Sequence, residues 1–348
     1  MHEHFADAVG QPDLIRLENR LVCLRFETMK VVSALTAVKS LLDSKTIIPG
    51  DTVIDSSSGI YAHALALACH RYGLQCHIVG STTIDATLRA QLAVLGVRLE
   101  QMPSSSNLKL DQNRRVARIR EILGQHPEYH WMRQYHDRVH YLGYRAVAAM
   151  IAHELGVREL TLVGPVGTGA SSGGLTTALR ENGVDTTLVG VQPFGSVTFG
   201  AEHVEDPEVI IAGIGSSIHF DNVAPNLFDV VHWISFTAAL SGAISLLREH
   251  AVFAGLSSGA AYLAALWEHR RDPARATLFV APDTGHRYVD SVFTRYQLAD
   301  PVEQLEPFAV EDRADLAMPW SRMHWGRRGG AGEAIADLWK KKPLTATA

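Results

Sequence analysis

The sequence predicts an α/β fold, with mostly parallel strands flanked by helices, in about two domains. Strand-like apolar runs alternate with helical repeats along most of the chain, and this order is typical of parallel sheets covered by helices. Clusters of glycine and serine follow several predicted strands, at the edge where α/β sheets bind ligands. A chain of 348 residues is long enough for about two domains.

The first predicted elements form a βαβαβ series. The segment RLVCLRFE alternates apolar and polar residues as a half-buried strand does, and a helical repeat of apolar residues begins at Val31. After this helix we expect a strand at 51–56, a helix at about 62–72, a strand at 74–80, a helix at about 86–95 and a strand at 97–103. A polar stretch at 104–120 follows the last of these strands.

The second series repeats the same alternation. After about Asp300 the order signal weakens, and GRRGGAG followed by KKKPLTATA predicts a mobile terminus. The expected elements are a helix at 141–156, strands at 159–169, 185–193, 229–235, 251–255 and 276–285, and helices at 173–182, 238–250 and 260–271.

Lys30 stands where the first of these helices is expected to begin. A helix N-terminus favours anions over cations, because its N–H groups are unpaired and its dipole is positive there. Lys30 is therefore either exposed to solvent or uncharged, and a lysine loses its charge when its amine is consumed in an imine. Taken alone, this position leaves both interpretations open.

The composition points to small-molecule chemistry. The chain has 32 basic and 37 acidic residues and a formal net charge of -5, so no overall attraction to nucleic acid or anionic membrane is expected. No apolar run reaches the roughly 18 residues of a membrane span, and the first residues lack a signal pattern. The cysteines, Cys23, Cys69 and Cys76, lie in apolar runs without metal-ligand spacing. We expect a soluble, cytoplasmic protein.

The segment GPVGTGASSGG at 164–174 is a candidate phosphate site. Small side chains ahead of a helix let backbone N–H groups converge on an anion. The segment lacks the Gly-Lys-Ser/Thr ending of a Walker loop, and its likeness to GxGxxG lacks the acidic ribose partner in clear register. A tight structural turn is the alternative interpretation.

Together, the ordered motifs resemble those of the fold-type-II pyridoxal-phosphate enzymes, the tryptophan synthase β / cysteine synthase family. The resemblance covers roughly residues 10–294. It rests on a lysine at a helix start (Lys30), a glycine-rich loop (167–174), GVQP at 190–193 where the family has GVEP, GLSSGA at 255–260 where it has GISSGA, and PDTGHRY at 282–288 where it has PDSGERY.

The resemblance implies a two-lobed fold with pyridoxal 5'-phosphate between the lobes, each lobe holding a mostly parallel, twisted sheet flanked by helices. The smaller lobe would span 31–134 and the larger one 1–30 plus 135–300, with a C-terminal extension at 301–348. A homodimer is expected, because the family is usually dimeric.

The same resemblance implies the roles of the site residues. Lys30 would hold the cofactor as an imine and later act as the base at the substrate α carbon. A hydroxyl of Ser257 or Ser258, Ser257 by motif position, would face the pyridine nitrogen, although helix N-capping would also explain both serines. The cofactor phosphate would lie on Gly167, Thr168, Gly169, Ala170 and Ser171. The substrate would contact Ser57, Ser58, Gly59, Ile60, Tyr61, Gln134 and Gly213.

The sequence departs from the family pattern at two places. Where the family reads T-S-G-N-T-G, this chain has Ser57 to Ala62, so Ile60 replaces an asparagine that bonds the cofactor's 3'-oxygen and Tyr61 brings a large ring to the expected carboxylate site. The Asn-Pro-x-Gly-Ser loop before the lysine is also absent. These departures make ordinary cysteine synthesis an unsafe expectation.

The favoured function is β-replacement on an activated serine-type amino acid, such as an O-acyl or O-phospho serine, through an aminoacrylate. The product could be a diaminopropionate-type or siderophore amino acid. The main alternative is an eliminating lyase or dehydratase that releases pyruvate and ammonia. A non-catalytic cofactor-binding protein is a further alternative. A nicotinamide-dependent oxidoreductase that uses 167–174 as its dinucleotide loop would need neither Lys30 nor visible absorbance.

Two charged patterns have plainer explanations. His136 and His140 could lie one turn apart and bind a metal, but no third ligand is evident and hydrogen-bonded or solvated histidines explain the pair. The cluster RRVARIR at 114–120 lacks interleaved aromatic residues, so it predicts a charged helix face and no nucleic-acid site.

Overall fold

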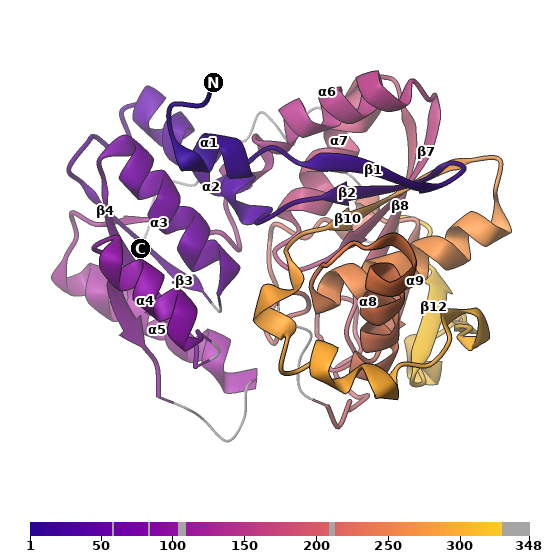
Figure 1. Ribbon diagram of the computed structural model, residues 1–348. Coiled ribbons are helices and arrows are strands. Elements are labelled where there is room, and N and C mark those ends of the chain that lie inside the picture. The colour runs from indigo at the N-terminus through magenta and orange to yellow at the C-terminus, as the bar shows by residue number, and fades with distance from the viewer. Residues whose placement is uncertain (58, 83, 104–108, 209–212, 329–348) are drawn as a thin grey trace.

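The computed structural model describes residues 1–328 except 58, 83, 104–108 and 209–212. It has two lobes, each built on its own sheet (Figure 1). The smaller sheet is wholly parallel, in the order β5-β4-β3-β6. Its strands are β3 (Thr52–Ser57), β4 (Gln75–Gly80), β5 (Arg98–Gln101) and β6 (His130–Trp131).

Helices cover both faces of the smaller sheet. One face packs on a large apolar cluster that includes residues of α2, α3 and α4, and the other packs on Ile119 and Ile122 of α5. The short helix α1 (Phe5–Val9) joins the first cluster through Ala6 and Val9. The helices are α2 (Lys30–Asp43), α3 (Ile60–Tyr72), α4 (Ala86–Val94) and α5 (Lys109–Gln125).

The larger sheet has the order β1-β2-β10-β7-β8-β9-β12-β11. Its five central strands are parallel, whereas β1 and β12 pair antiparallel with their neighbours β2 and β9. The strands are β1 (Asp13–Glu18), β2 (Leu21–Arg25), β7 (Glu159–Pro165), β8 (Asp185–Gln192), β9 (Val230–Ile234), β10 (Ala276–Ala281), β11 (Phe308–Val310) and β12 (Trp320–His324).

Two helix pairs sandwich the larger sheet. The pair α6 (Tyr144–Leu155) and α7 (Ala170–Glu181) packs into one apolar cluster, and the pair α8 (Phe236–His250) and α9 (Leu256–Arg271) packs into a second. No helix in the described ranges is long and apolar enough to cross a membrane. Short 3-10 turns are η1 (Arg138–Tyr141), η2 (Pro225–Leu227), η3 (Gly285–Tyr288), η4 (Phe293–Leu298), η5 (Val302–Gln304) and η6 (Arg313–Asp315).

The predicted α/β class is confirmed, and three details of the prediction are wrong. The expected strand at 251–255 is only an isolated bridge between Ala254 and Thr284, and α9 begins at Leu256, four residues earlier than expected. Order also continues past Asp300. The helix predicted at 114–120 is confirmed as part of α5, in which Ile119 and Ile122 form a buried face.

Two polar contacts anchor β12, which lies between β9 and the edge strand β11 in the larger sheet. Trp320 donates a hydrogen bond from Nε1 to His232 Nδ1 at 2.9 Å, and Arg322 Nε donates to Glu268 Oε1 at 2.6 Å. Trp320 is buried, so β12 closes the apolar cluster over α8 and α9. The weaker order expected after Asp300 is therefore wrong as far as residue 328. The mobile terminus predicted from GRRGGAG and KKKPLTATA falls almost wholly on residues 329–348, outside the described part.

Candidate active site

One cavity of about 440 Å³ lies between the two lobes, within the size range of small-molecule sites. It gathers residues that are far apart in the sequence, because parallel strands deliver the segments after them to one edge. Two of the predicted site residues are not found at the cavity: Ser58 lies outside the described residues, and Ser258 does not line it. The predicted residues that line the cavity are Lys30, Ser57, Gly59, Ile60, Tyr61, Gln134, Gly167, Thr168, Gly169, Ala170, Ser171, Gly213 and Ser257.

Lys30 is the first residue of α2, as predicted, and no side chain caps the helix there. The segment before it is held by backbone bonds to the PDTG motif: Met29 N donates to Pro282 O at 2.8 Å, and Thr28 bridges to Asp283. Lys30 turns its exposed surface to the cavity. Burial lowers the pKa of its amine to about 8, against the smaller opposing effect of Asp55.

Gln134 is the hydrogen-bond partner of the Lys30 amine, with 3.4 Å from Nζ to Oε1. Two further bonds fix its orientation: Nε2 donates to Ser56 O at 2.6 Å, and the backbone N donates to Asp55 Oδ2 at 2.9 Å. Burial raises the pKa of Asp55 to about 7, although three hydrogen-bond donors oppose the shift. The amide oxygen is thereby presented to Lys30.

The glycine-rich loop leads into the N-terminus of α7. Gly169 adopts φ +84°, and a Cβ at this position would collide with the backbone of Asn222. A Cβ on Gly167 would likewise collide with the carbonyl oxygen of Gly213. The loop is therefore packed against the backbone at two other places. It leaves the first N–H groups of α7, a helix of 12 residues, at the cavity. Such N–H groups can bind an anion.

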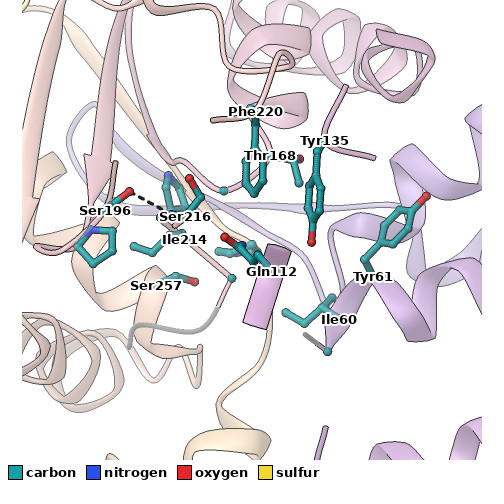
Figure 2. A pocket seen from close by; sticks show the side chains of 18 of the residues that line it. Ile60, Tyr61, Gln112, Tyr135, Thr168, Ser196, Ile214, Ser216, Phe220 and Ser257 are labelled. Atoms are coloured by element: carbon teal, nitrogen blue, oxygen red, sulfur yellow. Dashed lines mark hydrogen bonds between the residues drawn. The ribbon is translucent and has the colours of Figure 1, made fainter. Parts of the chain in front are cut away.

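The two candidate serines take different positions in the first turn of α9. Ser257 lines the cavity, and Figure 2 shows it on the same side as Ile214 and Ser196. The hydroxyl of Ser258 is buried without a hydrogen-bond partner among the described residues. The N-cap of α9 is Gly255, which has no side chain to cap the helix, so helix capping does not explain Ser257.

The loop at 57–61 forms the start of α3. The Ser57 hydroxyl accepts from Gly59 N at 3.1 Å and Ala62 N at 2.9 Å, so it acts as the cap. The Tyr61 ring lies 5.8 Å from the Lys30 amine, and its hydroxyl points away from the other labelled side chains (Figure 2). The large ring expected at Tyr61 does line the cavity, where it forms a wall, and its hydroxyl is buried without a hydrogen-bond partner among the described residues.

Arg115 is a cavity residue that the sequence analysis assigned to a charged surface. It is 2% exposed, pairs with Asp111 at 3.1 Å, and donates to the Tyr135 hydroxyl at 3.4 Å. Tyr135 also stacks on Phe220 with ring centroids 4.2 Å apart (Figure 2). The helical spacing of Asp111 and Arg115 with the buried Ile119 was the signal that could have placed Arg115 inward.

The histidines of HDRVH have separate partners. His136 lies 3.0 Å from Asp221 at the surface, whereas His140 is buried, lies 2.9 Å from Met132 O through Nε2, and lines the cavity. Burial lowers the pKa of His140 to about 4, so its ring is neutral near pH 7. No group of three or more metal-ligating side chains is found in the part of the chain that the structure describes.

Comparison with known proteins identifies the family. Residues 3–283 match the model of the family described as "Pyridoxal-phosphate dependent enzyme". The chain belongs to this family. Its cofactor is pyridoxal 5'-phosphate.

Two relatives are each named N-(2-amino-2-carboxyethyl)-L-glutamate synthase. The one from Ralstonia nicotianae is 31% identical over 73% of this chain and 75% of the relative. The one from Cupriavidus metallidurans is 33% identical over 75% and 77%. The solved cysteine synthase of Entamoeba histolytica has the same fold, with a TM-score of 0.77, 19% identity, and coverage of 88% of this chain and 96% of that one.

The cavity of this pyridoxal-phosphate enzyme fits its cofactor. It offers an amine with a lowered pKa, a backbone cradle at a helix N-terminus, and a hydroxyl at Ser257. These are the three groups that the aldehyde, phosphate and ring nitrogen of the cofactor require. The close packing of Gly167 against Gly213 and of Gly169 against Asn222 holds this backbone loop in place without a ligand.

The lowered pKa of Lys30 predicts a pH-dependent effect on stability in the enzyme freed of cofactor. Between pH 8 and 10.5 the unfolded chain binds the proton more tightly than the folded one, so stability rises with pH over that range. We expect Lys30→Met to raise the thermal midpoint below pH 8, and the gain to shrink as the pH rises to 10.5. A gain that stays constant across thermal melts over this range would contradict the shift.

Proposed function

We propose that this enzyme catalyses β-replacement on an activated serine-type amino acid with an anionic leaving group. One observation carries the proposal: the cavity pairs the Lys30 amine, with its lowered pKa, with the buried cation Arg115 on another wall. The amine suits proton removal at the α carbon, and the cation suits a departing anion. The synthase names of both relatives support a replacement reaction.

Cofactor binding is proposed to use three sets of residues. Lys30 would hold the aldehyde, the amides at the start of α7 would hold the phosphate through residues 167–171, and Ser257 would face the ring nitrogen. When bound, pyridoxal phosphate withdraws electrons from the α carbon of an attached amino acid. A neutral hydroxyl at the ring nitrogen limits full ring protonation, and this favours elimination at the β carbon.

Lys30 is proposed to act twice. It holds the cofactor at rest, and after a substrate amine takes its place the freed Nζ removes the α proton. An amine with a pKa of about 8 is close to the value that a base at neutral pH requires. Gln134, locked by Ser56 and Asp55, keeps an acceptor beside Nζ and so orients it.

Arg115 and Tyr135 are proposed to receive the leaving group. Arg115 carries a guanidinium, a group that matches the geometry of phosphate. The Tyr135 hydroxyl accepts from Arg115 and from Ser56 Oγ at 3.0 Å, so its own proton remains to be donated. This combination favours O-phosphoserine over O-acetylserine as the donor.

The donor preference predicts the effect of Arg115→Gln. We expect kcat/KM with O-phosphoserine to fall about tenfold to a hundredfold, the range for a charge-assisted hydrogen bond, with a much smaller fall for O-acetylserine. Arg114→Gln, at an exposed neighbouring position, should change neither. Equal losses with both donors would contradict a leaving-group role and indicate a structural one.

The nucleophile is proposed to be the amine of an amino acid. Both relatives are named for making an N-substituted glutamate. The assay supplies O-phosphoserine with glutamate, other amino acids or sulfide, and identifies products by mass spectrometry. A new N-linked diamino acid supports the proposal; pyruvate and ammonia with every nucleophile would identify the eliminating lyase instead.

Several broader expectations also remain proposals. The division into lobes at 31–134 and 135–300 is supported by the two separate sheets. Cytoplasmic location is supported by three buried cysteines with free thiols, and the absence of a nucleic-acid partner by the net negative charge. The homodimer is proposed because the family is usually dimeric, and a measurement of the molecular mass in solution tests it.

A further inference from the structure

Arg287 connects the two lobes at the cavity. It lies in η3 of the larger lobe, and its Nε donates to Asp85 Oδ2 of the smaller lobe at 3.2 Å. The other carboxylate oxygen of Asp85 accepts from Leu88 N at 2.8 Å and caps α4. Asp85 is therefore held by its helix and in turn fixes the position of Nε. The guanidinium at the cavity is thus preorganised before any ligand arrives.

The terminal nitrogens of Arg287 lie over the loop at 57–61. A Cβ built on Gly59 would lie 2.8 Å from both Nη1 and Nη2, so the guanidinium rests directly on this glycine. Neither nitrogen has a hydrogen-bond partner among the described residues. The side chain is 29% exposed and lines the cavity. Two parallel N–H donors are thus left for a ligand in the cavity.

A carboxylate is the ligand that this geometry fits. A guanidinium with both terminal nitrogens available binds carboxylates through two parallel hydrogen bonds. Two neighbouring residues of this loop offer no polar group to a carboxylate: Ile60 is apolar, and the Tyr61 hydroxyl is turned away (Figure 2). Arg115, the proposed partner of the leaving group, already donates from Nη1 to the Tyr135 hydroxyl, whereas both terminal nitrogens of Arg287 are available.

We propose that Arg287 binds a carboxylate of an amino-acid substrate at the Gly59 side of the cavity. The inference rests on the proposed function only in that the substrates are amino acids. The carboxylate belongs either to the donor or to the incoming nucleophile, because both carry one. Arg287 is then a specificity residue that rejects amines lacking a nearby carboxylate.

Equilibrium binding to the holoenzyme tests the proposal without turnover. L-Alanine has no leaving group, and L-alaninamide lacks the carboxylate; both are titrated while the visible absorbance of the cofactor is followed. If Arg287 holds the donor carboxylate, Arg287→Gln raises the Kd of alanine about tenfold or more and leaves that of alaninamide unchanged. If it holds the nucleophile, alanine binding is unchanged and the KM for glutamate rises by a similar factor.

Asp85→Asn is the matched control, because it keeps the helix cap and removes the charge pair. Because Asp85 positions Arg287 without touching the ligand, a carboxylate-binding Arg287 predicts that this variant weakens carboxylate binding less than Arg287→Gln does and leaves the Kd of alaninamide unchanged. A purely structural link between the lobes predicts equal losses in Asp85→Asn and Arg287→Gln, with alanine and alaninamide affected alike; that result overturns the proposal. The proposal is also overturned if Arg287→Gln changes neither the Kd of alanine nor the KM for glutamate. The alanine titration measures binding alone, so it still tests Arg287 if the enzyme is found not to catalyse β-replacement.

Discussion

Lys30→Ala should abolish the reaction, lowering kcat by about a thousandfold or more, because its amine is proposed to serve both as cofactor tether and as base. The protein should still fold, since replacing Lys30 removes an amine whose pKa is lowered by burial and therefore a cost to folding. It should bind pyridoxal phosphate reversibly and lose the visible band of the lysine-bound cofactor. Activity and absorbance after dialysis measure both effects.

Lys39→Ala provides the matched control for this variant. Lys39 lies on the same helix, is exposed, and pairs with Asp43 at 2.6 Å. An exposed pair of this kind contributes little to stability, so activity and absorbance should match the parent enzyme. Retention of the visible band in Lys30→Ala would show that another amine holds the cofactor.

Gly169→Ala should weaken cofactor binding by about a hundredfold, the equivalent of losing two charge-assisted hydrogen bonds. The added Cβ meets the backbone of Asn222, which is not free to move because its side chain donates to Gln134 O at 2.9 Å and Asp137 O at 3.1 Å. The loop must therefore shift away from the phosphate. Titration of the cofactor-free variant with pyridoxal phosphate gives the Kd.

Gly183→Ala separates the collision from backbone strain. Gly183 follows the other end of α7 at φ +78°, close to the +84° of Gly169, but nothing lies within 4 Å of an added Cβ. Both variants therefore carry the left-handed strain of about 1–2 kcal/mol, and only Gly169→Ala carries the collision. Equal cofactor affinity in the two variants would mean that the packing of the loop does not shape the phosphate site.

The residues assigned to the cofactor were predicted from several short motifs that together resemble one family. Lys30 conflicts with a helix N-terminus, and the small residues of 167–171 precede another helix, but each pattern alone left a purely structural interpretation open. Parallel strands then bring such segments to one edge. Ser257 lies at the cavity and Ser258 outside it because α9 begins at Leu256. The sequence pattern had predicted the start of this helix four residues later.

The substrate side depends on contacts between distant segments. Arg115 is turned inward by a helix whose other face is polar, and its partner Tyr135 lies 20 residues away. Arg287 reaches Asp85 across 202 positions of sequence. The strand β12 was missed because its order comes from pairing with β9 and from the buried contact between Trp320 and His232. No local periodicity encodes the contacts of Arg287 or of β12.

The most direct test is to reduce the purified enzyme with borohydride, which fixes the cofactor to the amine that holds it, and to map the modified peptide by mass spectrometry. The account predicts a single phosphopyridoxyl mass located on Lys30 by fragmentation of its peptide, and none on Lys39. Modification of a different lysine, or none after incubation with pyridoxal phosphate, would contradict the assignment of this cavity as the active site.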